Sequence, residues 1–207
     1  MERNLDKTLA EIKLVFIQLN KYMFNGELPE PVFVVQSSRR TKMNAMGWFT
    51  FGKIWIDKET GERFNEITIC AETLTQPLHR ILEVLVHEMV HLYNHTKGIV
   101  DCSASQYHNK KFKEAAERCL LKVNEIPHKT YGYAFTEPTQ RLKDLLDMVG
   151  VDDSAFNVGM AETKPSTKEY SMYSYVCDKC GHKFKTSADL VSAIHNDCGG
   201  TFQKQKS

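Results

Sequence analysis

The residues whose types and spacing could support chemistry lie in the segment His87-Glu88-Met89-Val90-His91. Two histidines four residues apart on an α-helix differ by about 40° of rotation and about 6 Å of rise, so both can bind one metal ion beside the helix. Glu88 follows the first histidine and can accept a proton from a water molecule that the ion activates. We therefore predict Zn²⁺ at His87 and His91, with Glu88 as the general base.

A catalytic zinc site usually has three protein ligands and one open position. His108 is the predicted third ligand, because it stands at the start of a later helix that can fold back against the first. His95 continues the four-residue spacing, but it lies about 80° around and about 12 Å along the helix from His87. We expect it to face solvent or to support a ligand, and His79 and His128 remain alternatives for the third position.

A second metal-binding pattern lies near the C-terminus, where Cys177-x2-Cys180 is followed after fourteen residues by His195-x2-Cys198. Two pairs of ligands on two turns can close a tetrahedral site with all four positions filled, which is typical of structural zinc. His182 competes with His195 for the fourth position. The other interpretation of the CxxC pair is a redox motif or a pair of idle thiols.

The elements that must position these residues follow from apolar periodicity and turn residues. The segment LEVLVHEMVHLY around the histidines is strongly apolar, so polar residues on its buried side would cost several kcal/mol without a partner such as a metal. We predict an α+β fold with helices packed on a small β-sheet. The expected helices begin near residues 5, 75, 109 and 139, and the expected strands cover 32–35, 47–51 with 54–56, and 67–70.

The predicted domains are a main domain over residues 1–150, a linker over 151–168 and a small C-terminal domain over 169–207. The linker has Gly, Pro, Ser and Thr without strong periodicity. The last forty residues are too few to form a core of their own, so a metal is expected to hold them together.

Composition excludes some classes of function. The 207 residues carry a formal net charge of +1, so a general electrostatic attraction to nucleic acid or membrane is not encoded. The first twenty residues do not have the pattern of a signal peptide, and no run reaches the roughly 18 apolar residues of a membrane span. We expect a cytoplasmic protein without a membrane partner. In that compartment Cys70, Cys102 and Cys119 are expected to be buried thiols.

The sequence resembles the SprT-like metalloprotease family over roughly Leu5 to Val149. The resemblance rests on the opening helix, the Leu28-Pro29-Pro31 stretch, the aromatic segment Gly47–Ile56, the Glu66–Cys70 segment, and the motifs HEMVHLYNH and YHNKKFKEAAE. It implies a zincin-like protease fold and places zinc on His87, His91 and His108. Phe112 stands one place later than the family's H-x-x-F pattern would put it. Members often end in a zinc ribbon, which the C-terminal cluster resembles, although the familiar ribbon has four cysteines.

The resemblance implies a zinc-dependent endopeptidase with one catalytic and one structural Zn²⁺, acting on proteins, including DNA-associated or DNA-crosslinked ones. Two other functions compete with this one. The first is a non-catalytic zinc-containing DNA-binding or adaptor protein that keeps the zincin scaffold, and the second is a metal-dependent hydrolase of small amides. DNA as a partner is also compatible with residues 163–207, which hold seven Lys and four acidic residues interleaved with aromatics.

The aromatic segment Gly47–Ile56 suggests how a peptide substrate is held. If it lies at a sheet edge beside the zinc, a peptide can add as an extra strand. Its aromatic side chains would then line the cleft or the core, and we expect the core for at least half of Trp48, Phe49, Phe51 and Trp55. An oxyanion stabiliser is not identified, because Tyr131, Tyr133 and His128 could approach the zinc but the tyrosines are expected to pack in the ordinary way.

Overall fold

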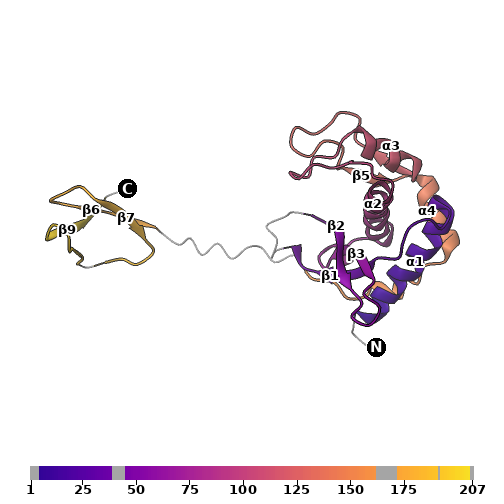
Figure 1. The fold of residues 1–207 in the computed structure, drawn as a ribbon, viewed down its shortest axis with the longest axis horizontal. Helices are drawn as coiled ribbons and strands as arrows, with labels where there is room; N and C mark the ends of the chain where they lie inside the picture. Colours follow the sequence, from indigo (N-terminus) through magenta and orange to yellow (C-terminus); the bar gives the residue numbers. More distant parts are fainter. Residues whose placement is uncertain (1–4, 39–44, 162–171, 191, 206–207) are drawn as a thin grey trace. The chain divides into compact units, whose positions relative to one another are not determined.

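The computed structural model describes residues 5–38, 45–161, 172–190 and 192–205. The chain divides into two compact units, residues 1–162 and residues 163–207. The N-terminal unit contains the helices, a three-stranded sheet and a two-stranded sheet, and the C-terminal unit contains a sheet of four short strands (Figure 1). Each unit is described here by itself.

The sheet of the N-terminal unit has the strand order β1-β3-β2. Its strands are β1 (Val32–Gln36), β2 (Gly47–Ile56) and β3 (Arg63–Cys70). The central strand β3 runs parallel to β1 and antiparallel to β2, and its last six residues are buried. Because β2 pairs only with β3 among the described residues, β2 forms one edge of the sheet. The three predicted strand regions are thereby confirmed, with β3 longer than expected.

Four α-helices occur in the described part of the N-terminal unit, and each matches a helix predicted from periodicity. They are α1 (Asp6–Phe24), α2 (Leu78–Thr96), α3 (Lys110–Arg118) and α4 (Gln140–Val149). Pro77 occupies the N-cap position of α2, where a missing N–H costs no helical hydrogen bond. Helix α2 is central in the unit, with contacts to the sheet, α1 and α3 (Figure 1). It buries Leu82, Leu85 and Met89 in the core.

A two-stranded sheet, which the sequence analysis did not predict, lies beside α2. It pairs β4 (Leu121–Val123) with β5 (Thr136–Pro138) in antiparallel orientation, and β5 contacts α2. Residue Thr136 is thereby buried against the histidine helix. Strands of three residues are too short to give a recognisable alternation.

The N-terminal unit extends past residue 150, which corrects the predicted linker of 151–168. A short 3₁₀ helix, η3 (Asp153–Phe156), packs on α1, and the Thr8 hydroxyl donates to the Ala155 carbonyl across 2.7 Å. Phe156 joins the main core, and the Met160 N–H donates to the Ala71 carbonyl. Residues 151–160 are therefore part of the N-terminal unit, while 162–168 lie outside the described residues.

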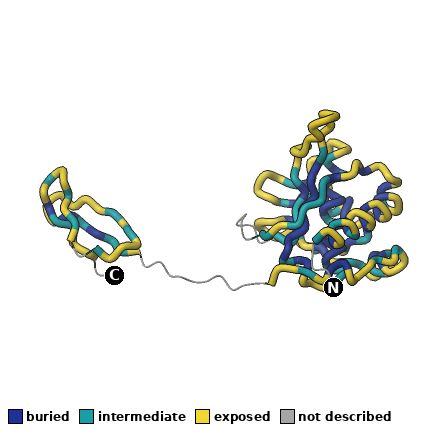
Figure 2. The backbone as a smooth tube through the Cα atoms, turned by 90° about the horizontal axis from the view of Figure 1, so that it is seen from below, coloured by how far each residue is buried: buried dark blue, intermediate teal, exposed yellow. Residues whose placement is uncertain are grey.

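The C-terminal unit is a four-stranded antiparallel sheet in the order β7-β6-β9-β8. Its strands are β6 (Tyr173–Cys177), β7 (Lys183–Thr186), β8 (Ile194–His195) and β9 (Gly200–Lys204). Most of its backbone is exposed or only partly buried (Figure 2). Tyr175 and Cys177 are its buried hydrophobic residues among those described, so side-chain packing alone gives this unit little stability.

None of the described helices combines the length and the hydropathy that a membrane crossing requires. The isolated cysteines behave largely as expected, since Cys70 and Cys119 are buried thiols, whereas Cys102 is only partly buried.

Candidate metal centres

Three histidines from two neighbouring segments converge in the N-terminal unit. His87 and His91 project from successive turns of α2, and His108 directly precedes Asn109, the N-cap residue of α3. The Asn109 side chain accepts hydrogen bonds from the N–H groups of Lys111 and Phe112, which starts α3 immediately after His108. The Nε2 atom of His108 lies 3.3 Å from Nε2 of His87 and 3.0 Å from Nε2 of His91.

Each of these imidazoles is held through its other nitrogen. His91 Nδ1 lies 2.9 Å from the Asp101 carboxylate, and His108 Nδ1 lies 3.0 Å from the Gln106 carbonyl. A carboxylate and a carbonyl can only accept, so both Nδ1 atoms carry the proton. Both Nε2 atoms then present lone pairs to the shared space, which is the tautomer that a metal ligand needs.

The imidazole of His87 also carries its proton on Nδ1, in this case through a hydrogen bond to a hydroxyl group. Its Nδ1 lies 3.0 Å from Oγ1 of Thr136, and the Thr136 hydroxyl itself donates to the buried carboxylate of Glu83. Because its one proton is used on Glu83, the hydroxyl accepts from His87. Arg80 pairs with Glu83 from the other side. Burial raises the pKa of Glu83 to about 7, and the bonds from Thr136 and Arg80 oppose that shift.

The histidine group fits a tetrahedral zinc ion. Zinc–nitrogen bonds of 2.0–2.1 Å at tetrahedral angles separate ligand nitrogens by about 3.3 Å, close to the two distances given above. Three lone pairs facing one another without a cation would repel. Burial lowers the pKa of His87 well below its usual value and that of His108 to about 4, so both rings are neutral near pH 7. The group therefore has the charge state and spacing for one divalent ion.

Phe112 fixes the three rings from one side. Its ring centroid lies 4.6 Å from those of His87 and His108 and 4.7 Å from that of His91. Phe112 is fully buried. The one-residue departure from the H-x-x-F pattern thus leaves the phenylalanine in contact with all three histidines.

Glu88 lies beneath the first part of β2. It is buried, with 4% of its surface exposed, and a Cβ added to Gly47 would come within 3.6 Å of its Oε1 atom. Burial raises the pKa of Glu88 to about 7, while a backbone hydrogen bond from Phe49 acts in the opposite direction. Glu88 can therefore exchange a proton near neutral pH.

The other histidine candidates lie outside this group. The His95 ring packs near Phe49 and Phe51, and His79 pairs with Asp147 on α4. His128 stacks on Tyr131 within the connection between β4 and β5. Of the two tyrosines considered as oxyanion stabilisers, Tyr133 is buried in the core, whereas Tyr131 is 44% exposed.

The expectation that at least half of the β2 aromatics lie in the core is wrong. Phe49 is buried, but Trp48 is only partly buried, and Phe51 and Trp55 are 51% and 43% exposed. The exposed aromatics lie in the second half of β2, where the pairing with β3 is interrupted between Thr50 and Trp55 and where every residue from Phe51 to Ile56 except Gly52 is exposed. Trp55 is instead tied through its indole N–H to Glu66, at 2.8 Å.

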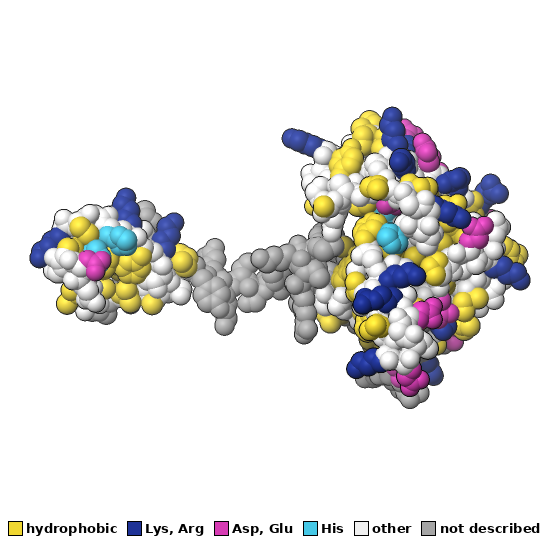
Figure 3. All heavy atoms as spheres, viewed as in Figure 1, with side chains coloured by type: hydrophobic (Ala, Val, Ile, Leu, Met, Phe, Trp, Pro, Cys, Tyr) yellow, Lys and Arg dark blue, Asp and Glu magenta, His cyan; other side chains and the backbone are white. Residues whose placement is uncertain are grey.

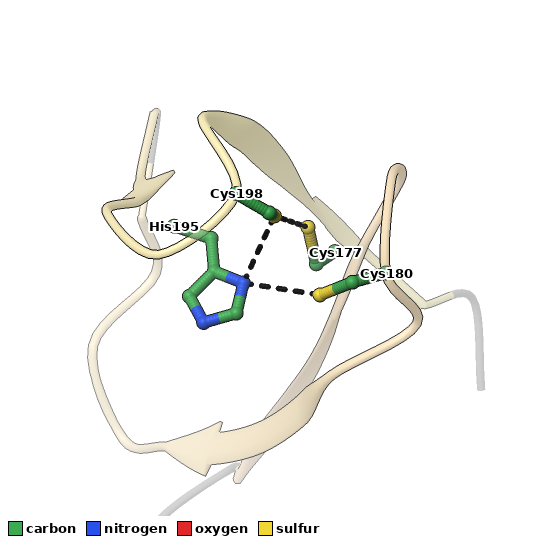
Figure 4. Close-up of side chains that lie close together, drawn as sticks. All are labelled: Cys177, Cys180, His195 and Cys198. Atoms are coloured by element: carbon green, nitrogen blue, oxygen red, sulfur yellow. Dashed lines mark hydrogen bonds between the residues drawn. The ribbon is translucent and has the colours of Figure 1, made fainter.

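The second group is in the C-terminal unit, where the ligand atoms of Cys177, Cys180, His195 and Cys198 all lie within 4.8 Å of one another (Figure 4). His195 Nδ1 lies 3.1 Å from the sulfur of Cys180 and 3.2 Å from that of Cys198. His182 is not in the group, and its ring stacks on His195.

The surroundings of this second group favour a thiolate-bound metal. Backbone hydrogen bonds from Cys180 and then Lys179 lower the pKa of Cys177 to about 6, and a thiolate is the form that binds zinc. A Cβ added to Gly200 would lie 2.5 Å from the Cys177 sulfur, so only glycine fits there. The cluster is compatible with a zinc ribbon.

The first unit is thus an α+β domain with a group of three histidines that could hold a metal ion, between its central helix and the segment entering α3. A model of the SprT-like family matches residues 12–132, more than half of the chain, so the protein belongs to the SprT-like family. This family suggests a metalloprotease-type function. Searches of curated proteins and of solved structures give no match.

The sequence analysis missed the residues that orient the histidines. Asp101 has no exposed surface, accepts from His91 and also accepts from the Asn94 amide across 2.8 Å. Thr136 orients His87 in a similar way, and Glu83 in turn holds the Thr136 hydroxyl. Asn94 stands three residues after His91, on the same helix face, which is a weak signal for a shared role. Asp101 and Thr136 gave no comparable signal, because their contacts with the histidines are tertiary.

Proposed function

We propose that the protein is a zinc-dependent endopeptidase of the zincin type, with one catalytic zinc ion on His87, His91 and His108. The observation that carries the proposal is the convergence of the Nε2 atoms of His87, His91 and His108, whose Nδ1 atoms all lie within hydrogen-bond distance of an oxygen acceptor. Glu88, next to His87 on the same helix, supplies the proton acceptor. A second, structural zinc ion would bind Cys177, Cys180, His195 and Cys198.

In this proposal a bound zinc ion would polarise the scissile carbonyl and acidify the attacking water. Glu88 accepts the proton of that water and passes it to the leaving amine, since its pKa of about 7 suits transfer in both directions near neutral pH. The backbone N–H of Phe49 orients the carboxylate. Asp101 and Thr136 keep two of the imidazoles in the ligand tautomer.

The edge strand β2 is the proposed binding element for the peptide. Its residues Gly47–Thr50 pair regularly with β3 on one side, and it contacts α2. A substrate added along the other side would hydrogen-bond through its backbone, which makes recognition tolerant of sequence. Exposed apolar side chains of β2, Phe51 and Ile54 among them, would contact the substrate.

DNA is the proposed partner of the C-terminal unit. Lys204 lies 3.9 Å over the Tyr173 ring, and the Phe184 ring packs against that of Phe202. On the face of this unit drawn in Figure 3, basic, hydrophobic and histidine side chains lie next to one another. Such surfaces combine base stacking with phosphate neutralisation. Binding to single-stranded DNA that falls steeply with added salt would support this role, and salt-independent or absent binding would exclude it.

The test of catalysis is cleavage of a denatured protein, with and without DNA, by the zinc-loaded full chain and by its Glu88→Gln variant. We expect Glu88→Gln to keep both zinc ions and lose at least about 100-fold in rate. Glu114→Gln, which makes the same chemical change at an exposed position on α3, serves as the matched control and should cleave like the wild type.

The same experiment separates the competing functions. A non-catalytic DNA-binding or adaptor protein on this scaffold would bind zinc and DNA, and neither the wild type nor Glu88→Gln would cleave. A small-amide hydrolase would act on short amides but not on a protein chain. Equal cleavage by wild type and Glu88→Gln would remove Glu88 from the mechanism.

A further inference from the structure

A pocket of about 430 Å³ opens at the C-terminal end of α2. Its walls come from three parts of the N-terminal unit: the edge strand β2, the last turn of α2, and the loop that follows α2. Phe51 and His95 form one side, and loop residues including Ile99, Val100 and Cys102 form the other. Nothing in the proposed metal chemistry uses this space.

The pocket adjoins the histidine group directly. The ring of Phe51 lies 6.1 Å from that of His91, and the Cys102 sulfur lies 4.0 Å from Nδ1 of His108. Cys102 also follows Asp101, which holds His91. Two of the three metal-binding histidines therefore have a pocket wall as neighbour, and a peptide with its carbonyl at the metal would have a flanking side chain close to the opening.

The residues that line the pocket determine which kind of substrate side chain it would bind. No Asp, Glu, Lys or Arg is among the lining residues, so a charged group that entered would lose hydration without gaining a partner of fixed opposite charge. Val100 is 70% exposed and Phe51 51% exposed, which leaves apolar surface uncovered beside the site. Covering such surface is favourable in proportion to its area. The volume is within the range of ligand-binding pockets and is sufficient for one large side chain.

We propose that this pocket binds a large apolar side chain, aromatic or branched aliphatic, of the substrate residue next to the scissile bond. The inference rests on the proposed peptidase function and adds selectivity to it. Phe51 links the two modes of recognition, since it belongs both to the edge strand and to the pocket wall. Backbone pairing along β2 would tolerate most sequences, while the pocket would impose a preference at one position.

The test uses the zinc-loaded full chain and a set of fluorogenic peptides that differ at one position on either side of the scissile bond. The varied residue is Phe, Leu, Ala, Asp or Lys. For one of the two positions we expect kcat/KM for Phe or Leu to exceed that for Ala by at least about tenfold, with Asp and Lys below Ala.

Val100→Arg and Val100→Trp then probe the pocket at an exposed position, where neither change disturbs the core. Val100→Arg should reduce the Phe-to-Ala ratio at least tenfold and raise the Asp-to-Ala ratio, because it adds a positive charge. Val100→Trp should reduce the Phe-to-Ala ratio by filling the space. Met148→Arg, an equally exposed apolar position on α4, should leave every ratio as in the wild type.

The outcomes separate this inference from the proposed function. If the wild type cleaves all peptides with similar kcat/KM, or if the Val100 variants keep the wild-type ratios of kcat/KM, the pocket does not select the substrate side chain. The proposed peptidase function would still stand. A zinc-loaded wild type that cleaves none of the peptides and no denatured protein would overturn both.

Discussion

The Nδ1 atom of His91 donates to the carboxylate of Asp101 across 2.9 Å, and Asp101 has no exposed surface. The pair joins the histidine helix to the loop that leads to His108. One Asp101 oxygen accepts from both His91 and Asn94, and the other is buried without a hydrogen-bond partner among the described residues. Such a carboxylate fixes the imidazole tautomer and increases its basicity as a ligand.

Replacing Asp101 with Ala should weaken zinc binding at the histidine site by about 10- to 100-fold, because His91 would lose the acceptor that keeps its proton on Nδ1. Competition with a zinc chelator measures the change. Asp144→Ala, at an exposed position on α4, is the matched control. An unchanged affinity in Asp101→Ala would show that the loop carboxylate does not support the ligand.

Thr136 allows a sharper substitution, because its hydroxyl alone links His87 to Glu83. Thr136→Val keeps the shape and removes the hydroxyl, so Glu83 loses a donor and the protein should lose about 1–3 kcal/mol of stability. Zinc affinity should also fall. Thr136→Ser retains the hydroxyl and should largely restore both properties, measured by thermal unfolding and chelator competition. If Thr136→Val has the same stability and zinc affinity as Thr136→Ser, the hydrogen-bond chain from His87 through Thr136 to Glu83 does not support the site.

Gly132 controls the position of the third ligand. It has a φ of +62°, and an added Cβ would lie 2.1 Å from the His108 carbonyl oxygen. Gly132→Ala should therefore destabilise the N-terminal unit by about 2 kcal/mol or more and impair zinc binding. Gly150→Ala has a similar φ of +74° but open space around the new Cβ, so it isolates the backbone strain. Equal effects of the two alanines would argue against the close approach at His108.

The pH dependence of zinc binding follows from the lowered imidazole pKa values. Burial lowers the pKa of His87 and brings that of His108 to about 4, so protons compete with zinc only at lower pH than usual. Between pH 7.5 and 5.5 these two ligands should together cost less than tenfold in affinity. Imidazoles with ordinary pKa values near 6.5 would cost about tenfold each. The measurement is zinc affinity between pH 7.5 and 5.5 for the double variant Cys177→Ser, Cys198→Ser, which keeps the histidine site and loses two ligands of the other site.

The sequence predicted those parts that depend on local pattern. Leu82, Leu85 and Met89 gave the helix that carries the histidines, and their burial follows from the 3.6-residue period. The Cys177–Cys198 spacing predicted the second group and left His182 as a competitor; the structure brings His195, and not His182, together with the three cysteines.

The parts that could not be predicted depend on tertiary contacts. Strands β4 and β5 are three residues each, too short for a periodic signal, and so the role of Thr136 was hidden. The four residues of η3 lack periodicity, although Phe156 completes the core against α1. Phe49 and Phe51 lie on the same face of β2 with their rings in contact, and the burial of Phe49 but not Phe51 depends on where along the strand the core ends, which residue type alone does not reveal.

The most direct test of the central claim is zinc X-ray absorption combined with metal counting, on the wild type and on the variant with Cys177→Ser and Cys198→Ser. The wild type should bind two zinc ions per chain, and the variant one. That one ion should have three imidazole nitrogens at about 2.0–2.1 Å and no sulfur, and His108→Ala should release it. A variant that binds no zinc, or binds it unchanged after His108→Ala, would contradict a metal centre built from these three histidines.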